Sequence, residues 1–188
     1  ATGGYKGQGQ LSTAGGTRSG SDVARGLAAV HRAGGVHRAI KPANLFLCGD
    51  GQALLGDFGI ARDSNRIDGS NEPIAGTPLF LAPEIWAGDQ PTAKCDLYAL
   101  GATAHLLATG TAPFRGDTAT ALFYAHTTQP YVTLPQSDPT RAFLFSAIAG
   151  LLQKDPARRP AHATELVRTL SMIEEPLPTF THHTKSGE

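Results

Sequence analysis

The sequence predicts an α+β domain that is mainly α-helical, a helical bundle that carries one short two-stranded β element. Three observations support this fold class. Apolar residues recur at helical spacing after Ser21, a long apolar run lies around residues 97–108, and two short apolar runs flank the Gly-Asp-Gly at 49–51. With 188 residues, 40% of them apolar, the chain is large enough to build one core of ordinary size.

The first twenty residues differ in composition from the rest. They are rich in glycine, serine, threonine and glutamine, so we predict a flexible lead-in over 1–20. The glycines between Gly4 and Gly9 begin a phosphate-binding G-x-G-x-x-G pattern, but the third glycine is missing and no strand pattern flanks them. We interpret them as linker.

A helix is predicted from Ser21, which is available as its N-cap. Val23, Leu27 and Val30 recur at intervals of four and three residues, and the glycines at 34–35 end the run. An amphipathic helix is expected over this stretch.

Two short strands are predicted next, at residues 45–47 and 53–55, joined by the tight turn at 49–51. This hairpin places Asn44 at the start of one strand and Asp57 just after the other. Two polar side chains that are distant in sequence are thereby expected to face one site.

The rest of the chain is predicted to be helical scaffold. Asp96 begins a largely apolar helix, residues 143–152 mark another, and a last helix ends near Leu170 after the polar stretch at 155–160. The domain is therefore expected to cover 21–172, followed by a disordered tail at 173–188.

Charge and cysteine content exclude several classes of protein. Sixteen basic and sixteen acidic residues cancel, which argues against nucleic acid as a partner. The longest apolar stretch is short and contains His105, so no membrane span is expected in this segment. Cys48 and Cys95 lie far apart, so the default expectation is a reducing, cytoplasmic setting, either for the chain itself or for a domain of a larger protein.

Three motifs follow one another in the chain. Residues 37–44 read His-Arg-Ala-Ile-Lys-Pro-Ala-Asn, residues 57–59 read Asp-Phe-Gly, and residues 82–84 read Ala-Pro-Glu. This order resembles the serine/threonine protein kinases of bacterial type, whose pattern is H-R-D-x-x-x-x-N, D-F-G and A-P-E. The resemblance covers 21–172, the C-terminal lobe of a kinase domain. The N-terminal lobe is not apparent.

The resemblance implies roles in phosphoryl transfer. Asn44 and Asp57 match the residues that hold two magnesium ions against the ATP phosphates, and Lys41 matches a lysine near the transferring phosphate. Asp57 therefore also belongs to the nucleotide site. Phe46 would lie beneath the adenine ring, although a phenylalanine here is equally expected as part of the strand core.

The family's general base is missing from its position. An aspartate there accepts the proton of the substrate hydroxyl, whereas this chain has Ala39, with no acidic residue within two positions. The chain is therefore expected to be catalytically inactive as written. The N-terminal lobe would supply the lysine and glutamate that bind ATP, which adds to this expectation.

The activation segment lies between the second and third motifs. Its polar stretch at 63–73 predicts a mobile loop, with Ser64, Ser70 and Thr77 as candidate phosphate acceptors. Arg38 matches the arginine that pairs with a phosphorylated loop residue. Thr77 matches the threonine beside the substrate hydroxyl in serine/threonine kinases.

The resemblance assigns structural roles to five further residues. Asp96 is expected to accept hydrogen bonds from the catalytic loop rather than to act only as an N-terminal acidic residue of its helix. Arg159 is expected to pair with Glu84. The structural set is His37, Phe58, Glu84, Asp96 and Arg159.

Three functional classes remain open. The chain is an active serine/threonine kinase inactivated by substitution, a natural pseudokinase that serves as a regulatory or protein-interaction module, or a C-lobe completed by another polypeptide. The resemblance implies Mg²⁺ and ATP as cofactors, whereas the unseen lobe argues against their binding by this chain. The expected partner is a protein substrate or a regulatory protein.

Overall fold

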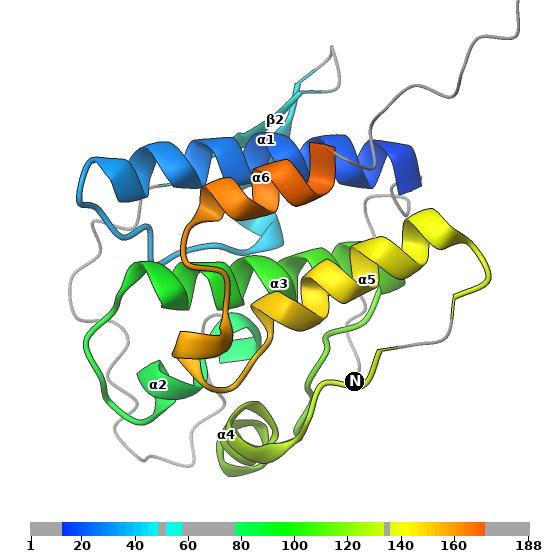
Figure 1. The fold of residues 1–188 in the computed structure, drawn as a ribbon. Coiled ribbons are helices and arrows are strands. Elements are labelled where there is room, and N and C mark those ends of the chain that lie inside the picture. Colours follow the sequence, from blue (N-terminus) through cyan, green and yellow to red (C-terminus); the bar gives the residue numbers. More distant parts are fainter. Residues whose placement is uncertain (1–12, 49–51, 58–77, 134–135, 172–188) are drawn as a thin grey trace, which may run out of the picture.

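A computed structural model describes residues 13–48, 52–57, 78–133 and 136–171 (Figure 1). The described part is mainly helical with a single two-stranded sheet, which confirms the predicted fold class. The elements are α1 (Thr13–Arg32), η1 (Pro42–Asn44), β1 (Leu45–Leu47), β2 (Ala53–Leu55), η2 (Pro78–Phe80), α2 (Pro83–Trp86), α3 (Ala93–Thr109), α4 (Ala119–Thr128), α5 (Pro139–Leu151), η3 (Pro156–Arg158) and α6 (Ala163–Ser171).

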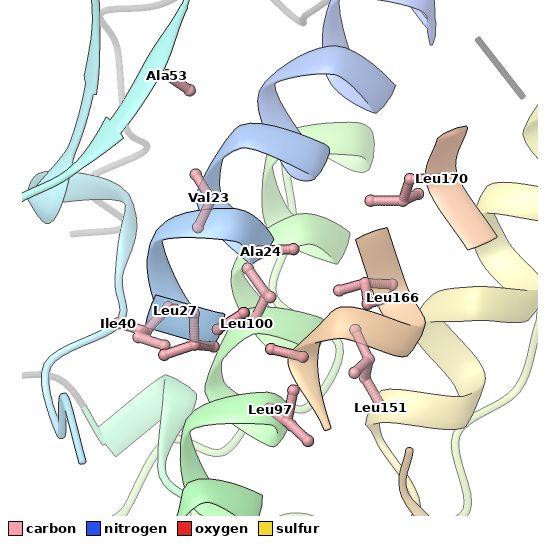
Figure 2. Close-up of a cluster of buried hydrophobic side chains, with 12 residues drawn as sticks. Val23, Ala24, Leu27, Ile40, Ala53, Leu97, Leu100, Leu151, Leu166 and Leu170 are labelled. Atoms are coloured by element: carbon pink, nitrogen blue, oxygen red, sulfur yellow. The ribbon is translucent and has the colours of Figure 1, made fainter. Parts of the chain in front are cut away.

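The helices are arranged around α3. In Figure 1, α1 and α6 run side by side on one flank of α3, the β1–β2 hairpin lies against α1, and α5 packs on α3. α2 and α4 meet at the opposite end of the molecule. Apolar side chains from α1, α3, α5 and α6 interdigitate in one core (Figure 2). Leu27 and Leu97, both fully buried, lie in this core.

A second core lies on the other side of α3. It joins α3 to η2, α5 and Ala125 of α4, and it contains the rings of Phe80, Tyr98, Phe114 and Phe145, all buried. Because η2 lies just before the third motif at 82–84, this core packs against the end of the activation segment.

The first helix begins earlier than predicted. α1 starts at Thr13, so the predicted boundary at 20/21 lies inside the helix, and Ser21, predicted as an N-cap, is a buried interior residue. Glycines lower intrinsic helix propensity, but tertiary packing overrides it here. A Cβ on Gly20 would come within 3.2 Å of Leu170 Cδ1, so the missing side chain lets α6 approach closely.

Both predicted strands are present at their predicted residues. They pair antiparallel with Leu45 opposite Leu55 and Leu47 opposite Ala53. Ala53 faces the α1 core, and its backbone N–H donates to Asp22 Oδ2 of α1 at 3.2 Å. The hairpin is thus tied to α1 at β2. Residues 49–51, the predicted turn, lie outside the described residues.

Two helices have no counterpart in the prediction. α2 is a single turn after the third motif, and α4 follows Thr118, whose side chain caps the Ala121 N–H. Among the described helices, none combines the length and the apolar character needed to cross a lipid bilayer.

Candidate active site

Residues 37–44, the first motif, form a loop that the side chain of Asp96 holds through hydrogen bonds. Asp96 is 1% exposed at the start of α3, and its carboxylate accepts the backbone N–H groups of His37 at 2.7 Å and Arg38 at 2.8 Å. His31 of α1 contacts the same carboxylate at 2.9 Å. One buried side chain therefore ties the loop to two helices.

Two residues of the site have left-handed backbone conformations. Arg38 has φ of 66° and Asp57 has φ of 53°. This conformation is strained for a residue with a Cβ, by about 1–3 kcal/mol, and persists where surrounding contacts impose it. At Arg38, the contact that holds this backbone conformation is the hydrogen bond from its N–H to the Asp96 carboxylate. The chain therefore changes direction just before Ala39 and again at Asp57.

Asn44 is buried between the loop and the hairpin. Its Nδ2 donates to the Ala39 carbonyl at 2.7 Å, which turns its Oδ1 away from that bond. The Asn44 carbonyl accepts the Gly56 N–H at 2.9 Å, one residue before Asp57. The hairpin thus brings Asn44 and Asp57 to one end of the sheet, as the sequence predicts.

The oxygen donors at this end suit magnesium. Asp57 is exposed and offers a carboxylate, and Asn44 offers an amide carbonyl. Magnesium prefers a few such hard ligands plus phosphate and water, rather than a cage made only of protein. In the part of the chain that the structure describes, no three His, Cys, Asp or Glu side chains gather as a metal site.

His37 is a neutral structural residue of the loop. Burial lowers its pKa, although the charge of Asp96 and the Gly56 backbone act in the opposite direction. Its Nδ1 accepts the Ala39 N–H at 3.3 Å. His37 therefore links the base position to the residue before Asp57.

Ala39 and Lys41 lie on the surface side of this loop. Both are half-buried, and Lys41 makes polar contacts of its own. Two hydrogen bonds fix the backbone of Ala39. Its N–H donates to His37 Nδ1, and its carbonyl accepts from Asn44 Nδ2. The loop is thus formed around a residue whose side chain is a methyl group.

Phe46 lies on the open face of the hairpin. Its side chain is 54% exposed, opposite the 49%-exposed Leu54. A Cβ on Gly56 would come within 2.7 Å of the Phe46 ring, so this ring covers Gly56. Phe46 is therefore a surface residue next to Asp57, and its strand-core interpretation is wrong.

Glu84 and Arg159 form the buried ion pair expected between them. Two guanidinium nitrogens reach the two carboxylate oxygens, at 2.5 and 2.8 Å. Burial would raise the pKa of Glu84, but the hydrogen bonds from Arg159 outweigh it and the pKa lies below its ordinary value. The Cys95 thiol also donates to Glu84 at 3.2 Å, and burial raises the pKa of that thiol to about 11.

Several predicted site residues lie outside the described residues. They are Phe58, Ser64, Ser70 and Thr77. Arg38, expected to pair with a phosphorylated loop residue, is described, and its side chain is exposed. Its assignment stays a prediction.

We expect Asp96→Asn to loosen the catalytic loop. The amide replaces one acceptor by a donor that faces a backbone N–H, and a lost hydrogen bond to a charged group is worth about 1.5–3 kcal/mol. Hydrogen exchange of the His37 and Arg38 amides measures the effect. Asp89→Asn, an exposed aspartate in the turn after α2, is the control. Equal protection of both amides in the two variants would contradict this role.

Buried histidines are expected to make the fold sensitive to acid. Burial lowers the pKa of His37, His105 and His126, that of His126 to about 3. Such groups bind more protons when unfolded, so their stabilisation is complete above about pH 6.5 and is lost as the pH falls towards the native values. Calorimetry should show the melting temperature falling as the pH is lowered from about 6.5 towards about 3, with a smaller fall for His126→Gln. An unchanged melting temperature over this window would contradict it.

Sequence reasoning missed a polar cluster beneath the third motif. Tyr98 of α3 bonds to His126 of α4, and Lys154 donates to the carbonyls of Ala125 and His126. Isolated histidine and lysine letters carry no signal of such contacts. The N-cap Thr118 is the signal by which α4, and hence His126, could have been placed.

Comparison with known proteins bears on this geometry. A family model described as "Protein kinase domain" matches residues 5–170. This match starts well before Ser21, inside the predicted lead-in.

Bacterial serine/threonine-protein kinases match most of the chain. It is 36% identical over 152 residues to "Serine/threonine-protein kinases drp72" of Corynebacterium efficiens, covering 80% of this chain and 29% of that protein. It is 37% identical over 171 residues to "Serine/threonine-protein kinase PknK" of Mycobacterium tuberculosis, covering 85% and 15%. It is 40% identical over 156 residues to "Serine/threonine-protein kinase PkaB" of Streptomyces coelicolor, covering 78% and 36%. The chain thus spans 15% to 36% of the length of these three relatives.

Proposed function

Because this chain belongs to the protein kinase domain family, we propose that it carries the metal-binding and substrate-facing part of a serine/threonine kinase site and that, with Ala39 at the base position, it does not transfer phosphate. The coarse activity class follows from the family and from relatives that are serine/threonine kinases. The inactivity rests on one observation, the methyl side chain at residue 39.

The chain's own residues would divide the remaining tasks. Asn44 Oδ1 and the Asp57 carboxylate would hold magnesium, which neutralises charge on the ATP phosphates. Lys41 would bind the phosphate being transferred. His37 and Asp96 orient the loop through backbone hydrogen bonds. Each of these tasks survives the loss of the base.

Removing the proton from the substrate hydroxyl is the task for which this chain lacks the family's aspartate, since Ala39 stands at that position. An aspartate at this position contributes on the order of 100- to 10,000-fold in rate. Asp96 cannot substitute, because its carboxylate is buried and occupied by two backbone N–H groups and His31. Among the described residues, Asp57 offers an exposed carboxylate, and its proposed task is to hold metal.

The proposal is tested by phosphate incorporation. The chain is incubated with magnesium and γ-labelled ATP and a substrate protein rich in serine and threonine, beside the variant Asp57→Ala. We expect both to give the same background. Incorporation by the unmodified chain clearly above the variant would refute the inactivity.

A binding or regulatory module, the pseudokinase alternative, is favoured by a second observation. Phe46 and Leu54 pair across the hairpin and are each about half exposed, an apolar patch on the open face of the hairpin. Such patches are typical of sites covered by a ligand or another polypeptide. We propose that nucleotide or a complementing protein segment covers them.

Thermal shift separates these occupants. A rise in melting temperature with magnesium and ATP that is lost in Asp57→Asn supports nucleotide binding at this patch. A rise only with an added N-terminal kinase lobe, lost in Leu54→Ser, supports completion by a second polypeptide. No rise in either experiment would overturn the binding module.

A further inference from the structure

The backbone of β2 presents an N–H on the side of the strand that faces away from β1. The Gly56 N–H donates to the Asn44 carbonyl at 2.9 Å, so these two residues are a hydrogen-bonded pair of the antiparallel ladder. Bonded and non-bonded pairs alternate along such a ladder, which makes Ala53 and Leu47 a non-bonded pair. The Ala53 N–H therefore points to the outer edge of the hairpin.

This outward N–H has an acceptor on α1. Ala53 is only 4% exposed, so water has little access to its N–H, and an unpaired donor at such a place is costly. Asp22 Oδ2 lies 3.2 Å from the Ala53 nitrogen and accepts this hydrogen bond. A helix side chain thus occupies the place that a third strand would take at this pair.

The Asp22 carboxylate has partners on two sides. Its Oδ1 accepts from Arg25 Nη1 at 2.9 Å, within α1, whereas Oδ2 faces β2. The Arg25 side chain is 53% exposed and that of Asp22 is 13% exposed. Because exposed ion pairs contribute little to stability, the bond to Ala53 is the more consequential of the two contacts.

The contact between β2 and α1 continues beyond Ala53. A Cβ built on Gly26, one helical turn after Asp22, would lie 3.8 Å from Leu55 Cβ, which is an ordinary packing distance. β2 therefore lies along α1 from Asp22 to Gly26, as the hairpin and helix in Figure 1 show. Two residues after Leu55, the chain reaches Asp57.

The place of Asp57 depends on both edges of β2. On the inner edge, the bond from the Gly56 N–H to the Asn44 carbonyl joins the two ends of the hairpin. On the outer edge, Asp22 fixes the strand to α1. Asp57 has a left-handed backbone with φ of 53°, a conformation that persists where surrounding contacts impose it. A strand free to pivot about its inner edge would let that conformation relax.

We propose that Asp22 is a positioning residue of the candidate active site, whose carboxylate holds the outer edge of β2 on α1 and so keeps Asp57 at one end of the sheet with Asn44. That Asp57 and Asn44 hold magnesium rests on the proposed function. The hold of Asp22 on β2 does not, and it is measured without metal or nucleotide.

Hydrogen exchange measures this hold. The amides of Ala53 and Gly56 are followed, with the Leu100 amide in the buried core of α3 as reference. The variants are Asp22→Ala, which removes the acceptor, and Asp22→Asn, which keeps an acceptor oxygen. Arg25→Gln is the matched control, because it removes the ion pair and leaves the Asp22 carboxylate in place.

In Asp22→Ala the Ala53 amide should exchange about ten-fold faster, the factor of one hydrogen bond to a charged group, and the Gly56 amide should lose protection with it. Asp22→Asn should keep most of the protection of both amides. Arg25→Gln should match the unmodified chain, and the Leu100 amide should be unchanged in all three variants.

A magnesium titration in the presence of ATP, followed at the Asp57 amide signal, measures the consequence for the site. The half-saturating magnesium concentration should rise in Asp22→Ala and stay unchanged in Arg25→Gln. If the unmodified chain shows no magnesium-dependent change, the proposed function fails, and hydrogen exchange alone decides the role of Asp22.

Equal exchange of the Ala53 amide in Asp22→Ala and Arg25→Gln overturns the proposal. Faster exchange at Ala53 with unchanged exchange at Gly56 also overturns it, because Asp22 would then hold one N–H and not the end of the strand that leads to Asp57. If Asp22→Ala does not fold, the unmodified chain decides. A scalar coupling across the hydrogen bond, between the Ala53 nitrogen and the Asp22 carboxyl carbon, is expected, and its absence overturns the proposal.

Discussion

Ala39→Asp is expected to restore phosphoryl transfer once an N-terminal kinase lobe is joined upstream of residue 5. The loop that receives the aspartate is already formed, through the bonds of His37, Asn44 and Asp96. The new carboxylate would accept the substrate proton, so the initial rate should rise by about 100- to 10,000-fold over the Ala39 protein. Labelled phosphate on a serine substrate measures it.

The matched control is Ala39→Asn in the same joined protein. Asparagine has nearly the shape of aspartate but cannot take the proton, so its rate should remain at the Ala39 level. Equal rates for the Asp and Asn variants would show that the base position does not limit the reaction. In the chain without an added lobe, Ala39→Asp alone should remain inactive, because the residues that clamp ATP phosphates in this family belong to that lobe.

Arg159→Met is expected to cause the largest loss of stability. The Arg159 side chain is fully buried and donates to both Glu84 oxygens and to the backbone carbonyls of Lys94, Gln153 and Lys154. Removing it leaves a carboxylate that is only 11% exposed without its counter-ion. Breaking a buried pair in this way costs about 3–5 kcal/mol, measurable by urea unfolding.

Arg158→Met is the control for this experiment. Arg158 is the preceding residue, with the same charge and an exposed side chain, so its loss should change stability by less than about 0.5 kcal/mol. The double variant Glu84→Gln with Arg159→Met should be less destabilised than the sum of the two single changes, because the buried charge is then removed. Similar losses for Arg158→Met and Arg159→Met would contradict the importance of the ion pair.

The elements with strong local signals were predictable. The apolar runs at 45–47 and 53–55 are short, bounded by glycines and placed by pairing across a hairpin, and the structure has strands at those residues. The start of α1 was not predictable, because Gly15, Gly16 and Gly20 oppose helix locally. Packing of α6 against Gly20 is a non-local effect that no window of sequence contains.

The candidate site likewise has residues that the sequence could place and residues that it could not. Asn44, Asp57 and Ala39 could be placed together because a motif specifies their spacing and a hairpin brings its ends together. The left-handed backbone of Arg38 could not be predicted, since it results from a hydrogen bond to Asp96, far away in sequence. His126 was missed for the same reason, because its partner Tyr98 belongs to α3.

The most direct test of the account is the initial rate of phosphate transfer by the lobe-joined protein that keeps Ala39, measured beside its Asp57→Ala variant and its Ala39→Asp variant. The account predicts that the Ala39 protein binds magnesium and ATP, yet transfers phosphate no faster than the Asp57→Ala variant. A rate for the Ala39 protein that approaches that of the Ala39→Asp variant would contradict it.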